Sequence, residues 1–276
     1  MHEKKIFLID SHCHLNLISC LKKKNNIKYI LEKSFRSHVY LLLTVSVSLQ
    51  DFKNSVKLFN KYKNILYSCG IHPLNHDIQK AEQFTKLKNL ILNNKNIIAL
   101  GETGLDFYKY NTTKKEQCFA FENHIELSIK YNKPLIIHTR NAKKKTLDIL
   151  SQKEYQSCYG VIHSFTGDID MARRLLDLGF YISFSGIITF KNAKDIKEIV
   201  KFIPINKILI ETDSPYLTPE PVRGTINMPS YLLYVAKYIS KLKKINIYDM
   251  AKIIKKNFFS LFNLPKIKLN KIIYRK

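Results

Sequence analysis

Eight short runs of apolar residues, rich in Ile, Leu and Val, are spread along the chain and predict eight β-strands. Each run is nearly continuous in apolar character, which is typical of strands covered on both faces, as in a parallel sheet. The runs occupy residues 6–9, 39–45, 65–69, 97–100, 135–137, 159–162, 181–184 and 208–210.

Segments with the spacing of amphipathic helices lie between these runs. Asp168 is expected to cap the start of one such helix, and Gly179 to end it. Beyond the eighth run, the proline-rich stretch SPYLTPEPVRG predicts a long loop, and two further helices are expected over residues 230–242 and 248–262. The clearest apolar stripes are Phe52, Val56 and Phe59; Phe84, Leu87 and Ile91; Cys118, Phe121, Ile125 and Ile129; and Met171, Leu175 and Leu178.

Strand and helix alternate eight times, and this alternation predicts an α/β fold, a single-domain (β/α)8 barrel of the TIM type. Such a barrel typically needs about 250 residues, which suits a chain of 276. We expect one catalytic barrel domain over residues 1–265 and a basic C-terminal extension over residues 266–276. An open doubly wound sheet has the same alternation and stays the alternative.

Composition narrows the class of protein. The cysteines, five in number, are scattered and never spaced as CxxC, which predicts reduced thiols rather than a disulfide framework or a structural zinc knot. No apolar stretch reaches the roughly 18 residues of a membrane span, and the start MHEKKIFLID lacks a signal-peptide pattern. We therefore expect a soluble, cytoplasmic protein without a membrane partner, and we favour a monomer.

The net charge of +24 favours a polyanionic partner such as nucleic acid. The alternative is a compositional bias, because Lys, Asn and Ile are abundant throughout while Arg is rare, as the codons of an AT-rich genome dictate. Charge is therefore only weak support for a nucleic-acid partner.

Residues that can hold a metal stand at or just past the ends of the predicted strands. The carboxyl ends of barrel strands form a ring on which distant parts of the chain converge. Imidazoles and carboxylates together suit zinc, manganese or iron, and magnesium less well. The set is large enough for two divalent cations, which predicts a metallohydrolase. The residues are His12, His14, Glu102, His138, His163 and Asp213.

Taken singly, most of these residues have an ordinary structural explanation. Alternation along a strand places His12 and His14 on one face, but an HxH match is common. A lone histidine such as His138 is more often a packed core residue, and Asp213 suits an Asx turn. Glu102, between glycines in ALGETGLDFY, is hard to explain as a loop residue after so apolar a lead-in. The metal interpretation depends on their joint occurrence at five strand ends.

The motifs DSHCHLN, GIHP, GETGLDFY, PLIIHTRNA, HSFTG and ETDSPYLTP occur in this order, and with them the chain resembles the TatD family of metal-dependent hydrolases and deoxyribonucleases. The resemblance runs from Asp10 to about Pro229. It implies a TIM-type barrel of the amidohydrolase (metallo-dependent hydrolase) kind and hydrolysis of phosphodiester bonds, with members described as magnesium-dependent 3′–5′ DNA exonucleases. It also implies that one cation is held by His12, His14, Glu102 and Asp213, and the second by Glu102, His138 and His163.

The expected mechanism uses a hydroxide held between the two cations to attack phosphorus, with Asp213 as general base. Arg140 and His72 lie just beyond strand ends and are expected to neutralise phosphate oxygens, although a salt-bridged surface residue is an equal alternative for Arg140. Asp10 is expected to orient one of the histidines. The candidates for stacking on an unpaired base, with packing as the alternative, are Tyr108, Phe165 and Tyr216.

Two positions depart from the family pattern. Leu74 follows Pro73 where the family often has a second histidine, which affects how the leaving group is handled. Met228 stands where a glutamate is expected between Asn227 and Pro229, which removes a carboxylate near the rim. Neither position belongs to the expected ligand set.

Three functions therefore remain open. The first is a metal-dependent deoxyribonuclease that uses magnesium, manganese or zinc and acts on single-stranded DNA or DNA ends. The second is a hydrolase of small esters, lactones or amides on the same barrel. The third is a basic nucleic-acid-binding protein without catalysis, and the complete ligand set speaks against it because binding alone requires none of those residues.

Overall fold

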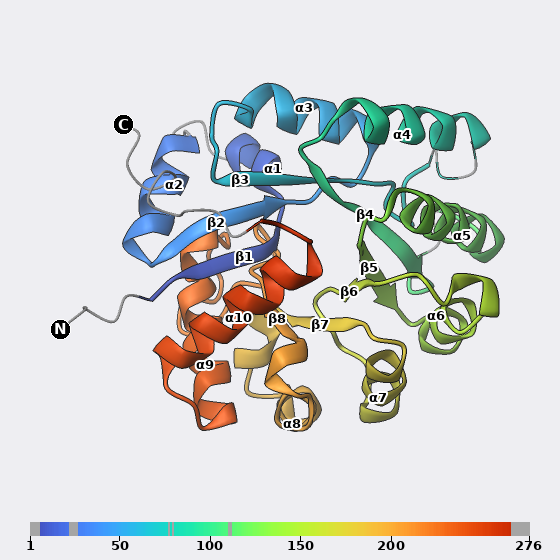
Figure 1. Cartoon of the computed structure of the whole chain (residues 1–276). Coiled ribbons are helices and arrows are strands. Elements are labelled where there is room, and N and C mark those ends of the chain that lie inside the picture. Colours follow the sequence, from blue (N-terminus) through green and yellow to red (C-terminus); the bar gives the residue numbers. More distant parts are fainter. Residues whose placement is uncertain (1–5, 22–26, 77, 79, 110–111, 266–276) are drawn as a thin grey trace.

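Eight parallel strands form the centre of the computed structural model, which describes residues 6–21, 27–76, 78, 80–109 and 112–265 (Figure 1). The strands follow one another in sequence order around the sheet, and each pairs with the next in parallel. Their bounds are β1 Leu8–Cys13, β2 Val39–Thr44, β3 Ile65–Cys69, β4 Ile97–Asp106, β5 Leu135–Arg140, β6 Gly160–Ile162, β7 Tyr181–Phe184 and β8 Ile208–Ile210.

Backbone hydrogen bonds join the first strand to the segment that follows the last one. The N–H of Asp213 donates to the carbonyl of His12 at 2.9 Å, and the N–H of His14 donates to the carbonyl of Ser214 at 2.8 Å. In a doubly wound sheet the first strand lies in the interior of the sheet and does not meet the last. The expected (β/α)8 barrel is therefore confirmed, and the doubly wound alternative is wrong.

Helices surround the barrel on its outer face (Figure 1). The last two, α9 and α10, correspond to the helices expected at the end of the chain, and α10 packs against β1 and β8. The α-helices are α1 Leu15–Leu21, α2 Ile27–Arg36, α3 Leu49–Phe59, α4 Ala81–Asn93, α5 Lys114–Tyr131, α6 Lys143–Leu150, α7 Ile169–Asp177, α8 Lys194–Phe202, α9 Leu232–Lys243 and α10 Ile247–Leu261. Single 3-10 turns are η1 Lys153–Tyr155, η2 Gly186–Thr189, η3 Ile205–Lys207 and η4 Pro229–Tyr231.

Helix α7 shows why the sequence pattern predicted these elements well. The side chain of Asp168 accepts a hydrogen bond from the N–H of Met171 at 2.9 Å and so satisfies one of the free donors at the helix start. Gly179 follows the helix with φ +86, a left-handed conformation that ends it at little steric cost. Met171 and Leu175 on the predicted stripe are buried against the barrel.

Three strands extend past the apolar runs that predicted them. His12 lies inside β1, Glu102 inside β4 and His138 inside β5, because backbone pairing with the neighbouring strand does not require an apolar side chain. Gly104, with φ +125, lets β4 pass close to β5, since a Cβ there would lie 2.1 Å from the carbonyl oxygen of His138. The polar side chains are therefore carried by rigid strand backbone rather than by loops.

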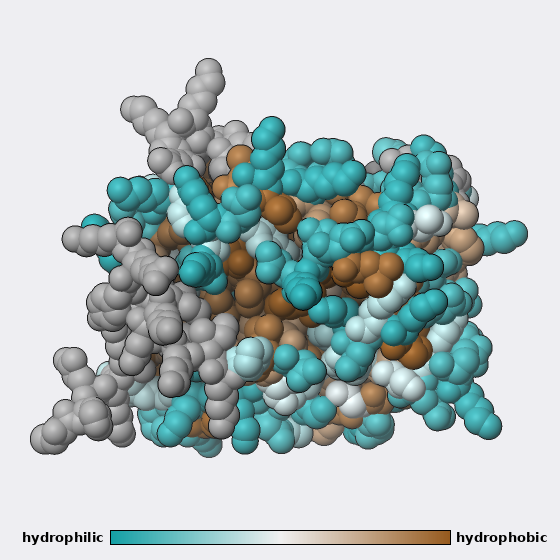
Figure 2. Space-filling model, turned by 45° about the horizontal axis from the view of Figure 1, so that its top comes forward, coloured by the Kyte–Doolittle hydropathy of each residue, from teal (hydrophilic) through white to brown (hydrophobic). Residues whose placement is uncertain are grey.

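The surface of the molecule is mainly hydrophilic on the face shown in Figure 2. Figure 2 shows that hydrophilic side chains cover most of one face, with apolar side chains visible mainly in its hollowed middle. Within the described residues, no helix is both long and apolar enough to cross a membrane. The expected extension over residues 266–276 lies outside the described residues. Four cysteines are free thiols, namely Cys13, Cys69, Cys118 and Cys158.

Candidate metal centre

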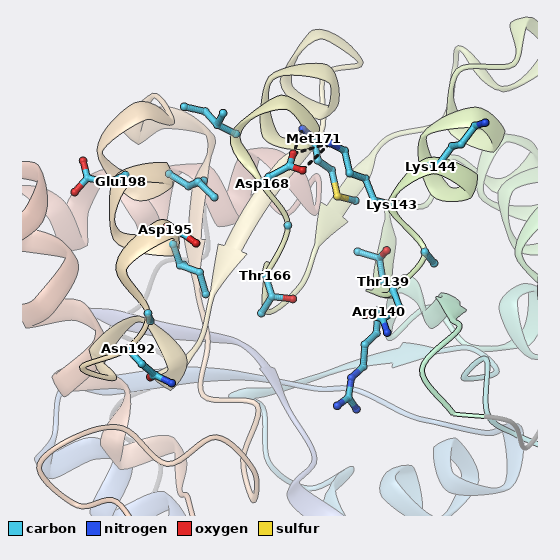
Figure 3. Close-up of a pocket in the computed structure, with 17 residues that line it drawn as sticks. Thr139, Arg140, Lys143, Lys144, Thr166, Asp168, Met171, Asn192, Asp195 and Glu198 are labelled. Carbon is cyan, nitrogen blue, oxygen red and sulfur yellow. Dashed lines mark hydrogen bonds and ion pairs between the residues drawn. The ribbon is translucent and has the colours of Figure 1, made fainter.

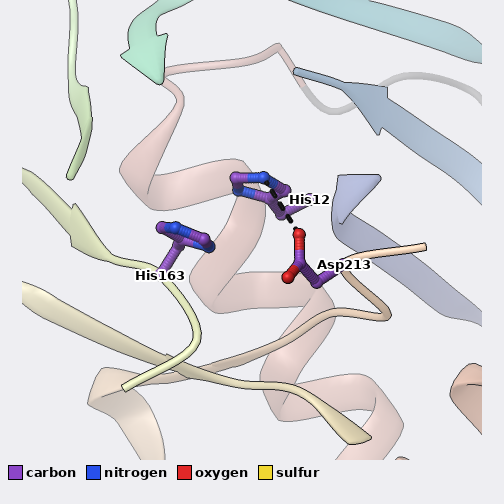
Figure 4. A group of neighbouring side chains, drawn as sticks. All are labelled: His12, His163 and Asp213. Atoms are coloured by element: carbon purple, nitrogen blue, oxygen red, sulfur yellow. Dashed lines mark ion pairs between the residues drawn. The ribbon is translucent and has the colours of Figure 1, made fainter. Parts of the chain in front are cut away.

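The residues expected to hold metal converge at the carboxyl end of the barrel strands. Nitrogen and oxygen atoms of His12, His163 and Asp213 lie within 4.8 Å of one another, as do those of His12, His14 and Glu102. Figure 4 shows the first of these groups, with the imidazoles of His12 and His163 stacked at 4.1 Å between ring centroids. The fold therefore brings together side chains that lie up to 201 positions apart in the sequence.

Glu102 lies at the middle of this cluster, and its two carboxylate oxygens face different histidines. Oε1 lies 2.9 Å from His138 Nδ1 and 2.9 Å from His163 Nε2. Oε2 lies 3.5 Å from His12 Nε2 and 3.8 Å from His14 Nε2. The carboxylate thus faces both pairs of histidines, one with each oxygen.

Asp213 completes the side of the cluster formed by the HxH pair. Its Oδ1 lies 3.4 Å from His14 Nε2 and 3.6 Å from His12 Nε2, and the two Nε2 atoms are 3.3 Å apart. A pair of imidazole nitrogens that face each other and two carboxylates at this distance forms a set of donors suited to a cation.

In three of the imidazoles, the ring nitrogen that points away from the cluster, here called the outer nitrogen, donates to a hydrogen-bond acceptor. The carbonyl of Val45 accepts from His14 Nδ1 at 2.9 Å. Asp106 Oδ2 accepts from His138 Nε2 at 3.0 Å, and Glu211 Oε1 accepts from His163 Nδ1 at 3.2 Å. With a proton on the outer nitrogen, the neutral form of each ring directs a lone pair toward Glu102 or Asp213. This is the arrangement found around histidine ligands of metals.

We expect the change Asp106→Asn to weaken metal binding by about 10- to 100-fold. The asparagine oxygen can still accept from the N–H groups of Tyr108 and Lys109, as Asp106 Oδ1 does at 3.0 and 3.2 Å. Its NH2 group, however, would face His138 Nε2 as a donor and would favour the ring form with the proton on Nδ1, which faces Glu102. Titration of the metal-stripped protein with zinc or manganese, in competition with a chelator, measures this effect.

The control for this change is Asp148→Asn, which makes the same replacement on an exposed face of α6. It is expected to leave metal affinity unchanged. Equal affinities for wild type and Asp106→Asn would show that Asp106 does not control the ring of His138.

Asp10 is fully buried, and within the described residues its hydrogen bonds join it to backbone N–H groups and a hydroxyl rather than to an imidazole. Its Oδ1 accepts from the N–H of His12 at 3.3 Å and from the N–H of Thr212 at 2.9 Å, and its Oδ2 accepts from the Thr212 hydroxyl at 2.5 Å. Asp10 therefore links β1 to the segment after β8 and holds the backbone of His12 rather than its ring. His12 Nδ1 is buried and has no hydrogen-bond partner among the described residues.

His72 reaches the same cluster from the loop after β3. Its Nδ1 accepts from the N–H of Leu74 at 3.1 Å, so a neutral ring carries its proton on Nε2, which lies 3.4 Å from Glu102 Oε1. In this form His72 is a hydrogen-bond donor toward the centre. The loop is anchored by buried His124 of α5, whose Nε2 accepts from the N–H of Ile71 at 3.2 Å.

Charges within the cluster shift the pKa values of its groups. Burial by itself raises the pKa of Glu102, but the charges of His163 and His72 and the hydrogen bonds from His12 and His138 outweigh it and hold that pKa well below its usual range. The same kind of balance, with burial opposed by the hydrogen bond and charge of Asp213, raises the pKa of His14 to about 9.

The pKa values of His163 and His12 are shifted in opposite directions. Burial lowers the pKa of His163, but Glu102 and Glu211 outweigh it and raise that pKa well above its usual value. Burial also lowers the pKa of His12, and there it wins, reinforced by the charge of His163. Since a cation binds only deprotonated imidazole, uptake of metal releases protons from His14 and His163 and is favoured as the pH rises.

The donor set fits divalent metal. Four imidazoles, three of them with the outer nitrogen held by an acceptor, and two carboxylates are gathered in a buried space, where His12, His14 and Glu102 are all less than 5% exposed. Left without a cation, these groups would concentrate charge at one buried place, which proteins avoid unless the groups bind something. The chemistry of the donors therefore supports a metal centre at this end of the barrel.

A cavity of about 580 Å³ leads to this centre. Arg140 and Lys109 line it, and neither forms a salt bridge within the described part of the chain. The guanidinium of Arg140 lies over the ring of Tyr108 at 3.9 Å from the ring centroid. The salt-bridged alternative for Arg140 is therefore wrong, and positive charge is available at the mouth of the cavity.

The aromatic residues considered for base stacking differ in position. Tyr108 and Tyr216 are 53% and 54% exposed, and Tyr216 lines the metal cavity, with its ring centroid 6.1 Å from that of His14. Phe165 is only 2% exposed and packs edge-on against Phe184 in the core. The stacking prediction for Phe165 is wrong, because the segment after β6 turns this side chain into the barrel wall.

The two departures from the family pattern lie in different places. Leu74 lines the metal cavity, so an apolar side chain stands beside His72. Met228 is 5% exposed and packed in the interior, and it is not among the residues that line this cavity. The first substitution affects the space offered to a ligand, whereas the second affects the packing of the loop that Asn227 holds through the carbonyl of Thr212.

Asp106 and Glu211 were not singled out as site residues from the sequence. Strand alternation carried a signal for both, since Asp106 lies four positions after Glu102, and Glu211 lies two positions before Asp213. His124 left no comparable signal, because its partner is a backbone N–H of a segment 53 positions away.

Comparisons with known proteins agree with this fold and centre. The family model described as TatD related DNase matches residues 9–263. An uncharacterized metal-dependent hydrolase of Buchnera aphidicola from Acyrthosiphon pisum is 49% identical over 267 residues, covering 94% of this chain and all of that protein. The uncharacterized metal-dependent hydrolase YcfH of Escherichia coli K12 is 39% identical over 268 residues, covering 97% of this chain and all of that protein.

Among solved structures, the TatD homologue YjjV of Escherichia coli K12 superposes with a TM-score of 0.85 at 23% identity, covering 94% of this chain and 98% of that one. At this identity the superposition supports the fold alone. The match to the family model spans almost the whole chain, and relatives well above 30% identity share its length. The chain therefore belongs to the TatD-related DNase family of metal-dependent hydrolases.

Proposed function

We propose that this protein is a metal-dependent deoxyribonuclease that hydrolyses phosphodiester bonds, removing nucleotides from the 3′ end of single-stranded DNA or of DNA ends. The observation that carries the proposal is the pairing of the buried histidine–carboxylate centre with Arg140 at its mouth, since this arginine has no acidic partner in the described residues. Arginine binds phosphate oxygens through two parallel N–H groups, so it suits a phosphodiester better than an uncharged ester or amide.

We propose two divalent cations, with magnesium, manganese or zinc as candidates. His12, His14, Glu102 and Asp213 would hold one, and Glu102, His138 and His163 the other. When bound, the cations would supply Lewis acidity and lower the pKa of a coordinated water molecule. The separation of the two Glu102 oxygens between the two histidine pairs supports this division.

The protein's own groups then position the substrate and take up a proton. Arg140 would neutralise a phosphate oxygen, and His72 would donate from Nε2. Asp213 would accept the proton of the attacking water, because the hydrogen bond and charge of His14 outweigh burial and lower the pKa of Asp213, so it is ionised at neutral pH.

The test is a turnover assay on the full chain, stripped with EDTA and reloaded with magnesium, manganese or zinc. Substrates are single- and double-stranded DNA labelled at the 3′ or 5′ end, RNA, and a panel of esters, lactones and amides. We expect metal-dependent release of mononucleotides from the 3′ end of DNA and loss of activity in EDTA. Absence of DNA hydrolysis with every metal, or turnover confined to uncharged esters or amides, would overturn the proposal.

A further inference from the structure

A second and larger cavity, of about 1060 Å³, lies beside the metal cavity (Figure 3). Its walls come from the end of β5, from the segments that precede α6, α7 and α8, and from these three helices. Arg140 lines both cavities, so the two spaces meet at this side chain. Apart from Arg140, no residue that lines the second cavity has a part in the proposed reaction.

Charge is unevenly divided across this cavity. Arg140 and Lys144 lie at the β5 side, whereas Asp195 and Glu198 of α8 lie at the opposite side (Figure 3). Lys143, between them, is already paired with Asp168 and Asp170, at 2.7 and 3.1 Å. An anionic group would therefore be favoured only at the Arg140 side, and a neutral group toward α8.

The middle of the cavity is suited to a flat heterocycle with polar edges. Ile169 is 44% exposed and Ile196 is half-buried, so apolar surface is available to cover one face of a ring. Thr166 and Asn192 are exposed, and their side chains make no hydrogen bond within the described residues. A hydroxyl and an amide can donate to and accept from the edge of a nucleobase.

We infer that this cavity binds the nucleoside next to the phosphate held at the metal centre, with that phosphate at Arg140 and the base toward Thr166 and Asn192. The inference rests on the proposed nuclease function and names a site for part of its substrate. A volume of about 1060 Å³ is ample for one nucleoside. The carboxylates of Asp195 and Glu198 fix the orientation, because they repel a phosphate and accept hydrogen bonds from amino groups of a base.

The test measures binding rather than turnover. The full chain, kept free of metal with EDTA, is titrated by calorimetry with deoxyadenosine 5′-monophosphate and with 2-deoxyribose 5-phosphate, which lacks the base. We expect the nucleotide to bind at least about tenfold more tightly, because only the base fills the apolar part of the cavity. The variants Thr166→Trp and Asn192→Trp fill the cavity from two walls and are expected to abolish this preference.

The matched control is Thr85→Trp, the same replacement at an exposed position of α4, which is expected to keep the preference. Equal binding of the two ligands by wild type, or an unchanged preference in both cavity-filling variants, would overturn the inference. The result is separable from the proposed function: a base preference without DNA hydrolysis contradicts only the nuclease proposal, and hydrolysis without a base preference contradicts only the nucleoside site.

Discussion

The change Glu102→Gln is expected to abolish hydrolysis, with a loss of at least about 10³-fold in kcat/KM, because several kcal/mol of metal-derived stabilisation disappear with the cations. The two oxygens of Glu102 face both histidine pairs, at 2.9 Å from His138 and His163 and at 3.5 Å from His12. Glutamine keeps the size of the side chain but loses its charge and one acceptor. Metal content of the purified variant, measured by mass spectrometry, is expected to fall together with activity.

The matched control is Glu126→Gln, which removes one negative charge from an exposed position on α5. It is expected to keep full activity and metal content. Thermal unfolding followed by circular dichroism separates loss of metal from loss of fold, since a folded variant keeps a cooperative unfolding transition whether or not it binds metal. A Glu102→Gln protein that retains both cations and normal turnover would contradict the central position given to this carboxylate.

The second large effect is expected for Asp213→Asn, a fall in kcat of about 10²- to 10⁴-fold, the range typical of a lost general base. Burial alone raises the pKa of Asp213, but the hydrogen bond from His14 and the charges of His12, His163 and His14 lower it, so the wild-type carboxylate is ionised at neutral pH. Asparagine is similar in size and keeps one oxygen that can bind metal, but it cannot accept a proton.

The pH dependence identifies the role of Asp213. Above about pH 4, the ionisation of Asp213 should cause no change in wild-type turnover. The reason is that the pKa of this carboxyl is already below its ordinary value. The residual rate of Asp213→Asn should instead rise with pH as hydroxide in solution replaces the missing base. Asp177→Asn, at an exposed position of α7, serves as control. If the variant loses its metal in parallel with its rate and shows the wild-type pH profile, Asp213 acts as a ligand alone.

The apolar pattern predicted the barrel closely because burial on both faces leaves a clear trace in each strand. The bounds of β3, β7 and β8 coincide with the apolar runs, and the caps of α7 were readable as Asp168 and Gly179. The pattern ended too early for β1, β4 and β5, where His12, Glu102 and His138 continue the strand. A polar side chain that points into a functional centre interrupts the apolar pattern without interrupting backbone pairing.

For the candidate site, the sequence named the residues but not their contacts. Phe165, a candidate for base stacking with packing as the alternative, is packed in the core, and Asp10, expected to orient a histidine, accepts hydrogen bonds from the backbone N–H groups of His12 and Thr212. Both outcomes depend on how segments distant in the sequence pack together, since Phe165 meets Phe184 and Asp10 meets Thr212. A motif read along one strand does not contain that packing.

The sequence by itself determined that this chain forms a barrel and carries imidazole and carboxylate groups at successive strand ends, because strand burial and ligand chemistry are local properties. Only the tertiary structure decided which atoms of those groups face each other. Val45, Asp106 and Glu211 accept hydrogen bonds from the outer nitrogens of three histidines, and the two oxygens of Glu102 face different histidines, through contacts between residues up to 90 positions apart. Such contacts follow from the closure of the barrel, which no single segment encodes.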